Sequence, residues 1–136
     1  MRPVIPCLLL TSILLATCAS MRPSAHATLA NVQQYAGAPI RRFDDRNSYQ
    51  GWQVIDPRNL VLFVGDDAYL LTVAPPCVQM QFATNIRLAD ATPAEVSRLD
   101  YVLFDQERCL IDQIRPLQAD KVRQVLAQQG SAAHRG

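Results

Sequence analysis

Histidine and glycine are both scarce in this chain. The 136 residues include two histidines, His26 and His134, and neither lies in the central part of the sequence. Without a histidine in the folded body, a Ser-His-Asp or Cys-His nucleophilic device is excluded. Zinc coordination is disfavoured for the same reason. The five glycines form no glycine-rich phosphate loop. We therefore expect no metal and no cofactor.

Excess charge of either sign is also lacking. The formal net charge of the whole chain is +1, and residues 28 onward hold eleven basic and twelve acidic side chains. The arginines are scattered along the sequence, so no basic field is expected to attract nucleic acid or an anionic membrane. Nucleic acid is therefore not an expected partner.

The N-terminal segment has the order of a secretory signal peptide. A short n-region with one charge, at Arg2, is followed by an uncharged apolar run over residues 4–19 and by Ala25-His26-Ala27. The run is about 16 residues long, which is shorter than the roughly 20 residues of a membrane-spanning helix. We expect a signal peptide over residues 1–27 and a periplasmic location.

Two processing sites compete. Leu15-Ala16-Thr17-Cys18 resembles the lipobox of bacterial lipoproteins, in which the cysteine is lipidated, although Thr17 departs from that pattern. Cleavage after Ala27 is the alternative and would release a soluble domain. Cys18 is thus a candidate lipidation site, and such a lipid is the one expected route to a membrane.

The remaining cysteines predict a structural disulfide. Cys77 and Cys109 lie beyond the signal segment, and in an oxidising compartment two cysteines most simply pair. A bridge would close a loop of 33 residues, and the chain-entropy estimate of its stabilisation is roughly 3.5–4 kcal/mol. A redox pair usually has the Cys-x-x-Cys spacing, which is absent.

The rest of the sequence divides into three parts. Residues 28–42 are small and polar and predict a flexible lead-in. Residues 43–129 predict a single disulfide-bonded domain, long enough for a modest core. Residues 130–136 predict a frayed tail, because Gly130 is expected to end the preceding helix.

Strand patterns dominate the first half of the domain. Alternation begins near residue 49 and ends at a turn over residues 57–59. A continuous apolar run, 60–64, predicts a buried strand. Gly65-Asp66-Asp67 then predicts a three-residue hairpin turn into a return strand over 69–73.

The second half is less regular. We expect a short helical turn after Pro76, a strand near Ile86, and at most one helical turn over 92–95, where Thr-Pro-Ala-Glu has the form of a capping box. Two strands, 99–104 and 109–114, flank Asp105-Gln106-Glu107-Arg108. Pro116 is expected to end the sheet.

A final helix is expected from Asp120, as its cap, to about Gln128, with an apolar stripe formed by Leu117, Val122, Val125 and Leu126. The predicted fold is α+β and mainly β. It is a small antiparallel sheet of five or six strands with one disulfide and a C-terminal helix.

Acidic and aromatic residues provide the remaining candidate sites. The adjacent carboxylates of Asp66 and Asp67 suit turn chemistry better than catalysis or calcium binding, because neighbouring side chains diverge. Asp100 and Asp112 interrupt strands and are expected to face solvent or to pair with an arginine such as Arg115. Aromatic side chains could line a groove, although strand aromatics more often pack in a core. They are Trp52, Phe63, Tyr69 and Tyr101.

The order of one set of residues along the chain is informative. The set is Trp52, Tyr69-Leu70-Leu71, Cys77, Ile86, Asp100, Cys109-Leu110-Ile111 and Ile114-Arg115-Pro116-Leu117. This order resembles a family of small exported proteobacterial proteins that is catalogued as a domain of unknown function, and many of its members look like lipoproteins with one cysteine pair. The resemblance covers roughly residues 43–117 and implies a Gram-negative envelope protein, without an assigned active site.

Three functions remain open from the sequence. The leading hypothesis is a non-enzymatic envelope protein that binds an envelope macromolecule, as an accessory or inhibitor of an envelope enzyme, through exposed tips at Asp66-Asp67 and at Asp105-Gln106-Glu107-Arg108. The alternative is a small-molecule or lipid carrier that uses the concave face of the sheet. A carboxylate-dependent hydrolase is the third hypothesis and requires two converging acids.

Overall fold

The computed structural model describes residues 25–44, 49–89 and 94–133. The expected signal segment, including Cys18, therefore lies outside the described residues, apart from residues 25–27. In chain order the elements are α1 (Ala25–Gln33), β1 (Arg42–Asp44), β2 (Tyr49–Asp56), β3 (Asn59–Val64), β4 (Asp67–Val73), the 3₁₀ turn η1 (Met80–Phe82), β5 (Ile86–Ala89), β6 (Glu95–Ser97), β7 (Tyr101–Phe104), β8 (Glu107–Leu117) and α2 (Ala119–Ala133).

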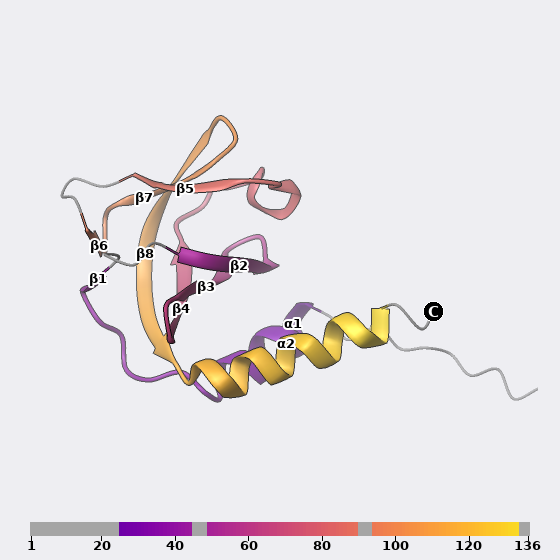
Figure 1. The fold of residues 1–136 in the computed structure, drawn as a ribbon. Coiled ribbons are helices and arrows are strands. Elements are labelled where there is room, and N and C mark those ends of the chain that lie inside the picture. Colours follow the sequence, from indigo (N-terminus) through magenta and orange to yellow (C-terminus); the bar gives the residue numbers. More distant parts are fainter. Residues whose placement is uncertain (1–24, 45–48, 90–93, 134–136) are drawn as a thin grey trace, which may run out of the picture.

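Six strands form one curled antiparallel sheet in the order β2-β3-β4-β8-β7-β5. The long strand β8 pairs with β4 along its C-terminal part and with β7 along its N-terminal part, and so joins the two halves of the sheet (Figure 1). The curl brings the two edge strands together. A hydrogen bond joins them, in which the Tyr49 hydroxyl on β2 donates to the Ile86 carbonyl on β5 at 2.6 Å. The expected fold class is confirmed.

The sheet is covered on both faces. On its inner face, Leu60, Leu62 and many other buried side chains form the larger core. On its outer face, Val61 packs with Val32 of α1 and Val122 of α2 in a second core. Strands that are buried on both faces read as continuous apolar runs, which explains the uninterrupted sequence of β3. Both helices lie on the same side of the sheet (Figure 1).

The predicted hairpin is confirmed, with a shorter turn than expected. Val64 pairs with Asp67, so Gly65 and Asp66 alone form the turn. Gly65 has a φ of 59°, the positive value that a type II′ hairpin requires at its first central position. The turn before β3 is also shorter, because Asn59 already pairs with Asp56.

Pro116 does not end the sheet as expected. It lies inside β8 and is paired with Tyr69, and the strand continues to Leu117. Its carbonyl accepts a hydrogen bond of 2.8 Å from the Gly37 N–H, which shows that its backbone polar groups point away from β4. The missing N–H of proline therefore removes no hydrogen bond from the β4–β8 ladder.

The lead-in is more structured than the sequence predicts. Residues 25–33 form α1, and isolated bridges join Ala36 to Leu117 and Ile40 to Ile114. Alanine favours helix, and the buried Val32 anchors α1 in the outer core. The segment expected to be flexible over 28–42 thus follows the free side of β8.

The C-terminal helix is longer than expected. It extends to Ala133 and passes through Gly130, where no neighbouring atom approaches the position of a side chain. The expected tail over 130–136 is therefore helical as far as Ala133. Asp120 lies within the first turn and is not the residue that precedes the helix. The predicted apolar stripe is confirmed, because Val122 and Leu126 are buried in the outer core and Val125 and Leu117 pack against it, Leu117 from the end of β8.

Two short strands were not expected. β1 and β6 pair as a separate antiparallel ribbon, with Arg42 opposite Ser97. The helical turn expected over 92–95 is wrong for its described part, because Ala94 has a φ of 79° and Glu95 begins β6. The 3₁₀ turn η1 and strand β5 confirm the expected turn after Pro76 and the strand near Ile86.

Candidate functional site

The disulfide fixes the segment that follows β4. Cys77 lies beyond the end of β4 and Cys109 lies on β8, and their Cα atoms are 5.7 Å apart. This separation falls in the ordinary range for a disulfide. Both cysteines are buried in the inner core. The predicted Cys77–Cys109 pairing is confirmed, and it attaches residues 77–82 to the central strand of the sheet.

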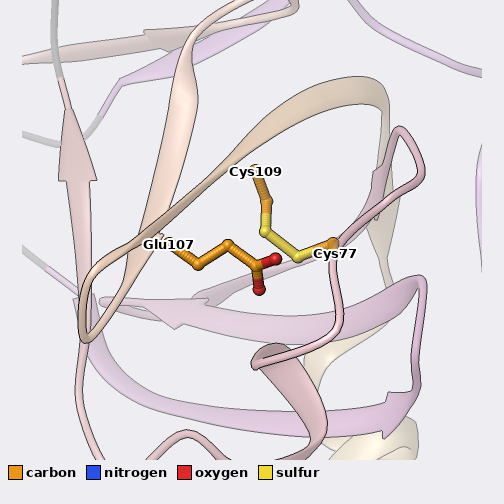
Figure 2. A group of neighbouring side chains, drawn as sticks. All are labelled: Cys77, Glu107 and Cys109. Atoms are coloured by element: carbon orange, nitrogen blue, oxygen red, sulfur yellow. A yellow bond between two sulfur atoms is a disulfide. The ribbon is translucent and has the colours of Figure 1, made fainter.

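Glu107 holds the same segment by a second means. It lies two residues before Cys109 on β8, so both side chains project from the same face of the strand. Its carboxylate accepts hydrogen bonds from the Val78 N–H at 3.1 Å and from the Gln79 N–H at 2.6 Å. Figure 2 shows the carboxylate directed toward the disulfide. The carboxylate therefore satisfies the backbone donors that precede η1.

The segment that the disulfide and Glu107 hold in place presents apolar side chains to solvent. Met80 is fully buried and anchors the segment, whereas the Val78 side chain is 61% exposed and that of Phe82 is 70% exposed. Gln79, which follows Val78, lines a hollow of about 530 Å³ together with Asp105, Gln106 and Glu107. The surface formed by Val78, Gln79, Phe82, Asp105 and Gln106 is named the ledge. It combines fixed backbone with exposed apolar area.

The group Cys77, Glu107 and Cys109 is also the one cluster in the described part of the chain that could supply three metal-ligand atoms, which lie within 4.8 Å of one another. Its sulfur atoms are bonded to each other and are not thiolates, the form that binds a metal. Its carboxylate already accepts two backbone hydrogen bonds. In the disulfide-bonded protein this cluster is structural.

The second predicted partner loop is smaller than expected. Phe104 pairs with Glu107, so only Asp105 and Gln106 form the tip, and Glu107 and Arg108 belong to β8. Asp105 has a φ of 53°, a left-handed conformation that aspartate tolerates. Asp105, Gln106 and Arg108 are exposed. The Arg108 guanidinium lies 4.4 Å from the centre of the Tyr101 ring.

The first predicted loop, Asp66-Asp67, lies at the opposite end of β8. Ala68 pairs with Leu117, whereas the other tip lies next to Glu107, so about 30 Å of strand separates them. Asp66 and Asp67 are both exposed, next to Gly65, whose carbonyl accepts a hydrogen bond of 3.3 Å from Arg123 of α2. The two predicted loops therefore do not form one surface.

The aromatic residues considered for a cavity do not converge. Trp52 packs against the inner core, whereas Phe63 packs in the outer core under Arg123. Tyr101 alternates with the inward-facing Val102 and so lies on the outer face. Tyr69 stacks on Phe43, with ring centres 4.1 Å apart.

Tyr69 has a perturbed acidity. Burial is the largest cause that raises the pKa of its hydroxyl above the ordinary value of 10.0, followed by the negative charges of Asp67 and Asp44. A tyrosine whose pKa is raised stays neutral at physiological pH. This perturbation therefore stabilises the packed, protonated side chain and does not create a nucleophile.

The two aspartates expected to interrupt strands have separate structural roles, and only Asp112 lies in a strand, because Asp100 is in the turn between β6 and β7. The Asp100 carboxylate accepts a hydrogen bond of 2.7 Å from the Ser97 N–H. Asp112 is exposed and lies 4.0 Å from Arg58, which agrees with the expectation that it faces solvent or pairs with an arginine, although that arginine is not Arg115. Arg115 instead donates a hydrogen bond of 2.9 Å to the Gly37 carbonyl. These two carboxylates are thus engaged with different partners.

The β1–β6 ribbon brings together arginines that are far apart in sequence. Arg41, Arg42 and Arg98 line a hollow of about 370 Å³ with Ser97 and Leu99. These arginines are scattered along the sequence, and their convergence could not be predicted because the pairing of two three-residue strands leaves no periodic signal. The exposure of Val78 and Phe82 has no signal in the sequence for a different reason, since apolar residues are normally expected in the core.

The comparisons identify a family. None of the helices among the described residues is long and apolar enough to cross a membrane. Neither the curated proteins nor the solved structures provide a significant match. A family described as "Family of unknown function (DUF6491)" matches residues 1–133, which is nearly the whole chain. The chain therefore belongs to the DUF6491 family.

Proposed function

We propose that this protein is an exported, non-enzymatic envelope protein that binds another protein through the ledge and acts as an accessory or inhibitor of an envelope enzyme. One observation carries the proposal. The ledge presents Val78 and Phe82, exposed to 61% and 70%, on a segment held by a disulfide and by Glu107.

The energetics favour a binding role for these two side chains. Burying an exposed valine or phenylalanine in a partner yields roughly 1.5–3 kcal/mol per side chain. Part of this free energy is normally offset by the conformational entropy that flexible groups lose when they become ordered on binding. The backbone of the ledge is already fixed at Cys77 and at the two N–H groups bonded to Glu107. Little ordering entropy is therefore lost when a partner covers it.

The surroundings of the ledge define the chemistry of the partner. Asp105 is exposed at the tip beside the hollow, and Gln79 and Gln106 add neutral hydrogen-bonding groups. An interface with an apolar centre and a polar rim is the usual anatomy of a specific protein complex. The proposed partner is a protein surface with an apolar socket and a basic rim.

Export is supported by two features. The N-terminal segment has the charged, apolar and Ala-x-Ala order of a signal peptide. A buried disulfide suits an oxidising compartment. The intact mass of the protein from a Gram-negative envelope tests this part. A mass that begins at Thr28, or at an acylated Cys18, supports export, and an uncleaved chain in the cytoplasm contradicts it.

The binding role is tested by affinity capture from envelope extract. The double variant Val78→Ser/Phe82→Ser removes the apolar centre of the ledge, and Leu99→Ser is the matched control because its side chain is 65% exposed on another surface. The wild type and the control should retain the same partner, and the double variant should lose it. Equal capture by all three proteins would contradict a role for the ledge.

A further inference from the structure

Two arginines that are 57 positions apart in the sequence face each other at the end of the β1–β6 ribbon. Arg42 pairs with Ser97, and the Arg98 N–H donates a hydrogen bond of 2.8 Å to the Arg41 carbonyl. The register therefore continues by one step and places Arg41 opposite Arg98. Directly opposed residues project from the same face of a ribbon, with Cβ atoms about 4.5–5.5 Å apart.

That face of the ribbon is anchored in the core. Phe43 and Val96 lie two positions farther along it, and both are buried in the inner core. Arg41 and Arg98 are exposed at its outer end. Both arginines line the hollow of about 370 Å³ and a second one of about 350 Å³ that extends to Asp112 and Gln113. The burial of Phe43 and Val96 therefore fixes the backbone positions from which the Arg41 and Arg98 side chains project.

The positive charge at this place is only partly balanced. Arg42 pairs with Glu95 at 3.0 Å. Neither Arg41 nor Arg98 makes an ion pair or a side-chain hydrogen bond with any residue that the structure describes. Asp112 lines the second hollow but lies 4.0 Å from Arg58. Like charges placed directly opposite each other destabilise a strand pair, so this arrangement opposes folding unless an anion is bound.

The turn beside the two arginines is held by hydrogen bonds. The Ser97 N–H bonds to Asp100, and the Leu99 N–H donates a hydrogen bond of 2.9 Å to the Ile111 carbonyl. Leu99 has a φ of 77°, which a leucine rarely adopts, and its side chain is 65% exposed at the rim of the hollow. A strained residue that the surrounding structure holds in place is a common feature of binding sites.

We propose that Arg41 and Arg98 form a binding site for a phosphate group, which is either free or part of a lipid headgroup. Each guanidinium offers a planar fork that matches two oxygens of an oxyanion. A carboxylate has one such edge, whereas a phosphate presents several and can occupy two forks at once. Leu99 at the rim would contact the apolar part of a phosphate ester.

The test uses the full-length, disulfide-bonded protein and inorganic phosphate at low ionic strength, followed by ³¹P NMR. The variants Arg41→Gln and Arg98→Gln each remove one fork, and we expect each to weaken binding about tenfold or more. Arg87→Gln is the matched control, because Arg87 is an exposed arginine on the edge strand β5, and it should bind like the wild type. Arg41→Lys keeps the charge without the fork and should be intermediate.

Sedimentation with vesicles distinguishes the two sources. Binding to phosphatidylglycerol vesicles but not to phosphatidylcholine vesicles, lost in both glutamine variants, assigns the site to a lipid headgroup. Binding to inorganic phosphate with the same dependence assigns it to free phosphate. No binding to either probe, unchanged binding in both variants, or equal displacement of phosphate by acetate overturns the proposal. The ledge variant Val78→Ser/Phe82→Ser should bind phosphate normally, so the site is tested independently of the partner surface.

Discussion

Removal of the disulfide should cost a large share of the stability of the domain. Cys77 and Cys109 are 32 positions apart, so their bridge closes a loop of 33 residues that contains η1, β5, β6 and β7. In the unfolded chain, the bridge therefore restricts the whole segment that forms these four elements. The perturbation is reduction of the wild type, with Cys77→Ala/Cys109→Ala as a second route to the same state.

The magnitude follows from the length of the loop. For 33 residues, the entropy that the bridge removes from the unfolded chain corresponds to about 3.7 kcal/mol at 25 °C. In a domain of this size, 1 kcal/mol shifts the melting temperature by about 4 °C or more, so reduction should lower Tm by about 15 °C. The alanine variant also loses two buried sulfur atoms and should be less stable again, by about 1 kcal/mol.

Urea unfolding, followed by tryptophan fluorescence, measures the difference directly. Oxidised and reduced wild type share every side chain, so their difference isolates the cross-link from the packing of the sulfur atoms. Hydrogen exchange adds a local measurement. The Val78 and Gln79 N–H groups, which bond to Glu107, should exchange faster when the bridge is opened. A loss of less than about 1 kcal/mol on reduction would refute the loop-closure reasoning.

Two further predictions concern tyrosines. Tyr49→Phe removes the hydrogen bond to Ile86 that joins the edges of the sheet, and urea unfolding should show a loss of about 1 kcal/mol. If stability is unchanged, that bond does not help to hold the curl. The pKa of Tyr69 is raised above its ordinary value of 10.0 by burial and then by Asp67 and Asp44. The stability from this protonated hydroxyl is complete below pH 10 and is lost as the pH rises through the raised folded pKa. Tyr69→Phe should therefore flatten the fall of the urea midpoint above pH 10, and an unaltered slope would contradict this assignment.

Local patterns predicted the elements that depend on neighbouring residues. The β3–β4 hairpin follows from an apolar run, a glycine turn and a return strand, and Gly65 supplies the positive φ that this turn requires. The Cys77–Cys109 bridge follows from counting cysteines beyond the signal segment. Each of these inferences uses residues whose preference does not depend on the rest of the fold.

The elements that depend on distant partners could not be predicted in this way. The β1–β6 ribbon joins two three-residue strands whose alternation is too short to detect. Pro116 continues a strand because its backbone polar groups point away from β4, and only the sheet order reveals that orientation. The helix α2 passes Gly130 because packing of its first turns outweighs the low helix propensity of one glycine.

The candidate site was predicted in part. The tip at Asp105 and Gln106 was expected from its polar turn residues and lies in the ledge. Val78 and Phe82 were not expected there, because apolar residues are normally taken as core. Met80 is buried in the inner core, and in the 3₁₀ turn η1 residues two positions apart point in different directions, so Phe82 does not follow Met80 inward. Arg41 and Arg98 come together only through the β1–β6 ribbon, so their pairing could not be predicted from the sequence.

Site-specific photo-cross-linking in the envelope can detect whether the ledge contacts a partner protein. A photoreactive phenylalanine analogue replaces Phe82 on the ledge, and the same analogue at Gln124, an exposed position on α2 on the other side of the sheet, serves as the control. We expect a discrete protein adduct from position 82 that is absent from position 124. No adduct from position 82, or the same adduct from both positions, would contradict the proposal that the ledge binds a partner.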